Sequence, residues 1–114
     1  MIKDIRSKLN IEKPEIVITD KLTVKVNDEA LAALTAMYKA AEIGEIIGEE
    51  DINIKEVVEK FSSLIDEIYE LLIPDYKKDV LKLKLSFSDT MTLIQSLVAI
   101  ARGEDEDEET PFQS

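Results

Sequence analysis

The side chains best suited to acid–base chemistry are three carboxylates, Asp66, Glu67 and Glu70, which fall within about one helical turn. A pair of carboxylates can act as general acid and base in glycoside hydrolysis. Here, however, all three lie on the polar side of a strongly amphipathic segment, where acids usually contact solvent. The 114-residue chain also contains no histidine and no cysteine, which removes the commonest general base and any thiolate nucleophile. The pattern favours a solvated face, and we expect no enzymatic activity.

Sequence motifs for binding phosphate, metal ions or nucleic acid are weak in this chain. The three glycines, at positions 44, 48 and 103, are too far apart to form a phosphate-binding loop. Residues 49–53 contain three acids but lack the alternating ligands and central glycine of a calcium loop. Four lysines between residues 77 and 84 lie beside Asp75 and Asp79, whose charges they balance more readily than they bind nucleic acid. We predict no catalytic residue, no metal site and no cofactor.

The chain is strongly acidic, with a formal net charge of −11. Six consecutive acids at residues 104–109 supply −6 of this charge and leave −5 for the rest. This balance disfavours binding to nucleic acid and to anionic membranes, and it permits basic partners. No apolar run approaches the length of about 18 residues that a membrane span requires, and the first ten residues lack the apolar core of a signal peptide. We therefore expect a cytoplasmic protein with no nucleic-acid or membrane partner.

A β-hairpin is expected at about residues 15–26, where the apolar pattern has the two-residue period of a strand. A two-residue loop would place the two isoleucines of the first strand opposite polar residues. A three-residue loop at residues 19–21 instead pairs Ile18 with Leu22 and Ile16 with Val24, so we prefer it. Because an isolated hairpin is marginally stable, its apolar face should rest on helices or on another subunit.

Helices are expected after the hairpin, at about residues 28–47, 54–72, 75–83 and 86–102. The first follows the capping residue Asn27 and ends near Gly44 or Gly48, which we interpret as helix-ending or loop glycines. The second has the clearest start, because Asn53 caps it and Glu56 follows three residues later. Apolar residues at helical spacing predict one face on the first of these helices: Leu31, Leu34, Met37, Tyr38 and Ala41. A corresponding stripe makes the second helix the main structural strut: Val57, Phe61, Leu64, Ile65, Ile68, Leu71 and Leu72.

The last predicted helix is apolar over most of its circumference, which is typical of a helix buried in its own domain or in a partner. Ser86 and Asp89 have the spacing of a capping box, Ser88 is a competing cap, and Gly103 provides a left-handed stop. Residues 82–85 before it permit a short third strand, and residues 1–13 permit one or two helical turns or a flexible leader. The fold class is therefore α+β and predominantly α-helical. We predict a single small domain at residues 1–102 and a disordered acidic tail at residues 103–114.

Residues 82–108, KLKLSFSDTMTLIQSLVAIARGEDEDE, resemble the corresponding part of tail-assembly chaperones of long-tailed, siphovirus-type phages and prophages of Gram-positive bacteria. The resemblance consists of a serine-capped apolar helix that ends in glycine and is followed by an acidic tail. A looser likeness covers the whole plan of the chain, with an early β segment and an acidic helical body of about a hundred residues.

The resemblance implies a non-enzymatic chaperone that binds the tape-measure protein and helps to recruit tail tube subunits during tail morphogenesis. Such a protein would act in the cytoplasm of the bacterial host and would be absent from the mature virion, and a longer frameshifted form often accompanies it. Apolar residues in the glycine-flanked segment and in the last helix are the candidates for protein contact: Gly44, Ile46, Ile47, Leu93, Leu97 and Ile100. Two other functions remain open, an acidic mimic of nucleic acid and a homo-oligomeric protein-binding scaffold whose hairpins pair across subunits.

Overall fold

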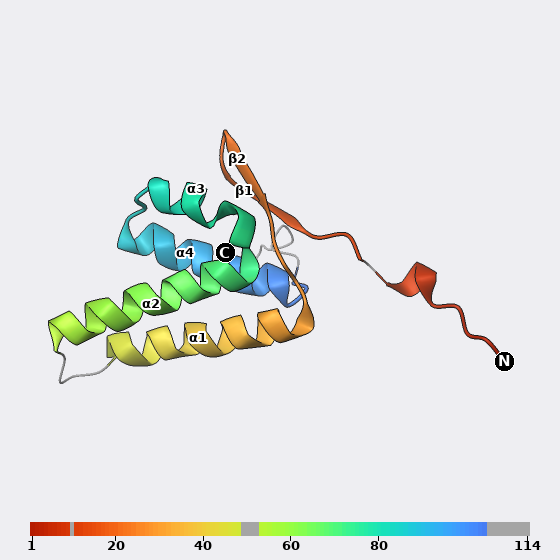
Figure 1. Ribbon diagram of the computed structural model, residues 1–114, viewed down its shortest axis with the longest axis horizontal. Helices are drawn as coiled ribbons and strands as arrows, with labels where there is room; N and C mark the ends of the chain where they lie inside the picture. The colour runs from red at the N-terminus through yellow and green to blue at the C-terminus, as the bar shows by residue number, and fades with distance from the viewer. Residues whose placement is uncertain (10, 49–52, 105–114) are drawn as a thin grey trace, which may run out of the picture.

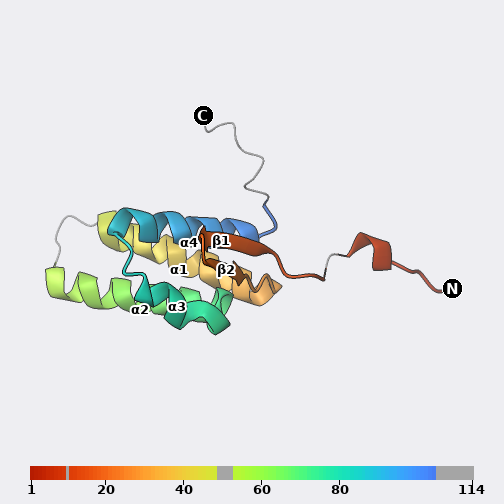
Figure 2. The ribbon, with the colours of Figure 1, turned by 90° about the horizontal axis from the view of Figure 1, so that it is seen from above.

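The computed structural model describes residues 1–9, 11–48 and 53–104 of the chain. Within these residues the body is mostly helical, with an N-terminal antiparallel hairpin, as the sequence predicts (Figure 1). Viewed from above, α3 lies on the same side of the body as α2, and α4 lies on the opposite side (Figure 2). The elements are β1 (Glu15–Thr19), β2 (Leu22–Lys25), α1 (Ala30–Gly48), α2 (Ile54–Leu72), α3 (Lys77–Lys82) and α4 (Phe87–Ala101), with 3₁₀ turns at Arg6–Lys8 and Pro74–Tyr76.

The hairpin has the expected apolar pairing but not the expected turn. Ile16 lies opposite Val24, whereas Thr19 rather than Ile18 lies opposite Leu22. The predicted three-residue loop is therefore wrong, because the turn has two residues and a bulge at Ile18 restores the register further along the strand. Neither turn residue has a positive φ, so the turn requires no glycine. The bulge supplies the additional strand twist that such a turn lacks.

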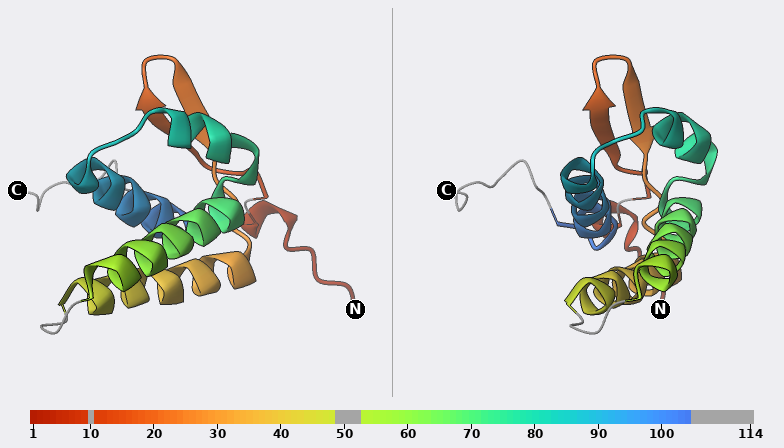
Figure 3. Two further views of the ribbon diagram at one scale, coloured as in Figure 1. Left: turned by 60° about the vertical axis from the view of Figure 1, so that its left-hand side comes forward. Right: turned by 90° about the vertical axis from the view of Figure 1, so that its left-hand side faces the viewer.

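Helix α1 buries a different face from the one that its leucines predict. The buried side consists of alanines followed by Ile43, and the leucines point away from the body. Small side chains allow α1 to lie close to both α2 and α4, against which it packs at the edge of the body (Figure 3). Gly44 lies inside this helix, so its interpretation as a helix end is wrong, and Gly48 is the last helical residue. The buried alanines are Ala32, Ala33 and Ala36.

Asn27 connects the hairpin to the end of α2. Its side-chain oxygen accepts a hydrogen bond from the Glu29 N–H at 3.1 Å, immediately before α1 begins at Ala30. Its side-chain nitrogen donates to the Leu71 carbonyl at 3.0 Å, and its backbone N–H donates to the Leu72 carbonyl at 2.7 Å. The last carbonyls of a helix have no partner within the helix. Asn27 therefore joins the residue before α1 to the C-terminal end of α2.

The predicted boundaries of α4 are confirmed by its caps. The Ser86 hydroxyl accepts a hydrogen bond from the Asp89 N–H at 3.0 Å. At the other end Gly103 has a φ of +91°, and its N–H donates to the Ile100 carbonyl at 2.9 Å. The following N–H reaches the carbonyl five residues back, which completes a Schellman motif. Asn53 caps α2 as predicted, accepting hydrogen bonds from the two N–H groups of residues 55 and 56.

The remaining segments differ in part from expectation. Residues 82–85 form no strand, and the chain turns from α3 toward α4 at Lys84, whose φ is +52°. Residues 1–9 are exposed and project away from the body, with one 3₁₀ turn at Arg6–Lys8 (Figures 1 and 2). Most of the predicted tail, residues 105–114, lies outside the described residues.

Candidate functional site

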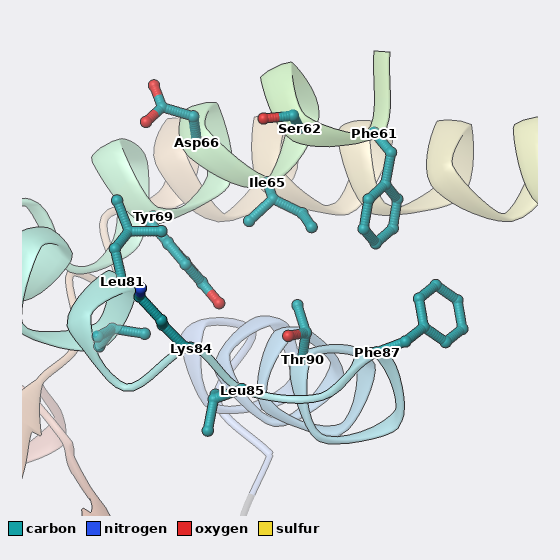
Figure 4. Close-up of a pocket in the computed structure, with 11 residues that line it drawn as sticks. Phe61, Ser62, Ile65, Asp66, Tyr69, Leu81, Lys84, Leu85, Phe87 and Thr90 are labelled. Carbon is teal, nitrogen blue, oxygen red and sulfur yellow. The ribbon is translucent and has the colours of Figure 1, made fainter. Parts of the chain in front are cut away.

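An open groove lies between α2, α3 and the start of α4, with a volume of about 460 Å³ (Figure 4). We call it the α2–α4 groove. Its apolar lining comes from three elements and the α3–α4 connection: Phe61, Ile65, Tyr69, Val80, Leu81, Leu85 and Phe87. Concave sites lined by apolar and aromatic side chains, with a few polar groups, are the usual binding sites of proteins.

Two aromatic rings form one end of the groove. The ring centroids of Phe61 and Phe87 are 5.5 Å apart, and the ring planes are inclined by 31°. Phe61 is half-buried on α2, whereas Phe87 is exposed at the first turn of α4, directly after the Ser86 cap. The cap fixes where α4 begins, and it thereby places Phe87 next to α2.

Tyr69 forms part of the floor of the groove. The residue is only 2% exposed, and its hydroxyl points into the groove (Figure 4). That hydroxyl forms no hydrogen bond with any residue that the structure describes, and burial raises its pKa. The groove therefore presents a hydrogen-bonding group that an occupant can satisfy.

The three carboxylates that suggested acid–base chemistry hold lysines at the rim of the body. Lys77 lies 2.9 Å from Asp66 and 3.1 Å from Glu70, and these hydrogen bonds raise its pKa. Lys39 on α1 lies 2.8 Å from Glu67, and that hydrogen bond raises its pKa as well. All three acids are exposed, so each pair contributes little to stability. The pairs join α2 to α1 and to α3.

The apolar stripe of α2 extends beyond the part that other elements cover. Its C-terminal half is buried, but Ile54 is 71% exposed and Val58 is 58% exposed. Both residues share the helix face of Phe61 and Ile65, because the steps between them are three or four residues. A continuous apolar surface therefore runs from the start of α2 into the α2–α4 groove.

The residues predicted to contact a protein partner do not form one exposed site. Leu93 and Leu97 lie in the hydrophobic core, and Ile46 and Ile100 are half-buried against it. Only Ile47 combines a large apolar side chain with an exposed position, at the C-terminal end of α1, and Gly44 is exposed on the same helix. Whether any of them contacts a partner stays a prediction.

Sequence reasoning missed the groove because its lining comes from separate elements. Phe61 and Ile65 belonged to the predicted core stripe of α2, and nothing in their spacing shows where that stripe loses its cover. Phe87 and Tyr69 had no assigned role.

The described residues contain neither a cluster of metal ligands nor a membrane-spanning helix. No group of three or more acidic side chains is arranged to hold a metal ion. No helix in the same part of the chain is both long enough and apolar enough to cross a membrane. Comparisons of the chain with protein-family models, with curated protein sequences and with solved structures find no match.

Proposed function

We propose that this protein is a non-enzymatic tail-assembly chaperone of a long-tailed phage or prophage, which binds the tape-measure protein, tail tube subunits or both. The observation that carries the proposal is the uncovered apolar stripe of α2 leading into the α2–α4 groove. The choice of this family depends on the resemblance in residues 82–108. The groove supports the broader class, a protein that binds an apolar segment of another protein.

The dimensions of this surface suit a helical client. From Ile54 to Tyr69 the stripe is about 22 Å long, or four helical turns. An amphipathic helix that docks in such a groove inserts apolar side chains at three- and four-residue spacing. The Tyr69 hydroxyl, which forms no hydrogen bond with the described residues, can pair with a polar group of the client.

The acidic charge has a separate role in the proposal. The tape-measure protein is long and prone to aggregation in this family, and a bound partner of net charge −11 keeps such a complex soluble. The proposed place of action is the cytoplasm of the bacterial host. The protein leaves when the tail tube polymerises, so it is absent from the mature virion.

The experiment that tests the proposal is co-expression with the tape-measure protein encoded in the same genome, followed by size exclusion of the soluble fraction. We expect the client to be soluble only with this protein and to co-elute with it. Phe87→Glu and Val58→Glu place a charge on the docking surface and should abolish co-elution. Val17→Glu changes a residue on the hairpin that is 71% exposed, against 57% for Phe87 and 58% for Val58, and is the matched control, which should co-elute normally.

Other outcomes distinguish the alternatives. An insoluble client, with this protein eluting alone, rejects the chaperone function. Binding of a client that disappears at high salt favours an acidic mimic, because salt weakens charge interactions more than apolar contacts. Self-association that increases with concentration, measured by sedimentation, favours the homo-oligomeric scaffold.

A further inference from the structure

Helix α1 carries three large apolar side chains of its N-terminal half on the outside of the body. Leu31, Leu34 and Tyr38 are 74%, 60% and 71% exposed, and Ala41 continues the same line. We call these four residues the α1 stripe. Single exposed apolar residues are common on protein surfaces, but a contiguous row of them marks an interaction site.

The spacing of the α1 stripe is that of a helix-pairing seam. Its residues are separated by steps of three, four and three positions, as in the a and d positions of a coiled coil. The seam is about 15 Å long, which corresponds to almost three helical turns. A straight partner helix can cover all four side chains at once.

The α1 stripe lies on a different face from the α2–α4 groove. α1 forms the edge of the body farthest from the hairpin and α3, and its buried alanine side faces α2 and α4 (Figures 1 and 3). No described element packs over Leu31, Leu34 or Tyr38. An occupant of the stripe therefore does not compete with an occupant of the groove.

The charges around the α1 stripe indicate what covers it. The seam continues into Glu42 and Glu45, which form no ion pair with the described residues, and Glu29 lies just before it. The base nearest to Glu42 and Glu45 in sequence, Lys39, is paired with Glu67, and the base nearest to Glu29 is Lys25 on the hairpin. Acidic groups therefore flank the apolar seam at both ends.

These charges disfavour a second copy of the chain as the occupant. Parallel pairing of two α1 helices would place Glu45 opposite Glu45. Antiparallel pairing would place Glu45 and Glu42 near Glu29 of the other copy. Like charges in contact reduce the affinity in both arrangements, whereas basic residues at these positions increase it.

We propose that the α1 stripe is a docking surface for an amphipathic helix of a partner protein, with an apolar seam at three- and four-residue spacing flanked by lysine or arginine. This inference goes beyond the proposed function, because it concerns a separate face. It does not depend on the client being a tape-measure protein.

The test uses a synthetic, fluorescently labelled peptide of about three heptads, with leucine at a and d and lysine or arginine at e and g. Binding to the full chain is measured by fluorescence anisotropy. Leu34→Glu and Tyr38→Glu should each weaken binding by about tenfold or more. Both variants add negative charge, so an interaction that depended on charge alone would become stronger.

Two controls make the result specific. Val17→Glu has the same charge change at an exposed apolar residue and should bind as the wild type does. Val58→Glu closes the approach to the α2–α4 groove, which can also accept an amphipathic helix, so Leu34→Glu is measured in the Val58→Glu background as well and should weaken binding there by the same factor. Circular dichroism and urea unfolding establish that each variant is folded, which is expected because all four residues are exposed.

Three results would overturn the inference. The first is wild-type affinity, or tighter binding, in the α1 variants. The second is loss of peptide binding in Val58→Glu but not in Leu34→Glu, which would place the peptide in the groove. The third is self-association of the wild type that Leu34→Glu abolishes, which would make a second copy the occupant. None of these results depends on the co-expression experiment.

Discussion

Replacing Ala36 with leucine should destabilise the protein, although leucine is the more apolar residue. Ala36 is completely buried on the side of α1 that faces α2 and α4. A leucine adds three carbon atoms to an interface that is already packed, and overpacking of this kind costs about 1–3 kcal/mol. Alanine and leucine have similar helix propensities, so the change reports on packing rather than on helix formation.

The matched variant is Leu34→Ala, two residues earlier on the opposite side of α1. Truncation of a buried leucine costs about 2–5 kcal/mol, whereas a surface substitution usually changes stability by less than about 0.5 kcal/mol. Because Leu34 is mostly exposed, we expect the smaller value. The leucine-to-alanine change that appears severe in the sequence is thus expected to be nearly neutral, and the alanine-to-leucine change to be damaging.

Urea unfolding followed by circular dichroism measures both effects. With a slope of about 1–3 kcal/mol per molar urea, destabilisation by 2 kcal/mol lowers the midpoint by roughly 1 M. A large loss of stability in Leu34→Ala together with a neutral Ala36→Leu would show that the leucine face is the buried one. That result would also remove the basis of the α1 docking surface.

Further predictions concern the two kinds of glycine and the asparagine between hairpin and helices. Gly44→Ala should stabilise the protein by about 0.5–1 kcal/mol, because Gly44 lies within α1 and no heavy atom lies within 4 Å of an added Cβ. The same change at Gly103 should destabilise it by about 1–2 kcal/mol, because the φ of +91° disfavours any residue with a Cβ. The urea unfolding midpoints of the two variants measure both changes in stability. Equal shifts of the midpoint would contradict the placement of Gly44 inside α1 and of Gly103 at a left-handed position. Asn27→Ala removes hydrogen bonds to the Leu71 carbonyl and from the Glu29 N–H and should cost about 1–2 kcal/mol. Faster hydrogen exchange at the Glu29 amide would accompany that loss, and unchanged exchange would contradict the hydrogen bond from the Glu29 N–H.

Local signals in the sequence predicted most of the elements. Asn53 and Ser86 start their helices through hydrogen bonds to N–H groups two or three residues away, and Gly103 ends α4 through its own φ. Each signal acts within a few residues, so it does not depend on the rest of the fold. The fold class and the helix boundaries to within about two residues follow from such signals.

The candidate site could be predicted less well, because it depends on which surfaces remain uncovered. Leu93 and Leu97 were proposed as contacts, yet the core occupies them. Val58 belonged to no predicted site, yet it is exposed where α2 extends beyond its neighbours. Apolar residues at a regular spacing identify a face that avoids water. The spacing does not show whether the chain's own helices cover that face or leave it free.

The hairpin and α1 show that local sequence patterns also leave part of the fold undetermined. The sequence alone determined that residues 15–26 alternate as strands and that α1 is helical, because backbone period and capping are properties of neighbouring residues. Only the tertiary structure decided that Ile18 forms a bulge and that α1 turns its alanines inward. α1 has apolar residues on both sides, so its orientation is fixed by how closely α2 and α4 can approach, and that distance depends on side chains far away in the chain.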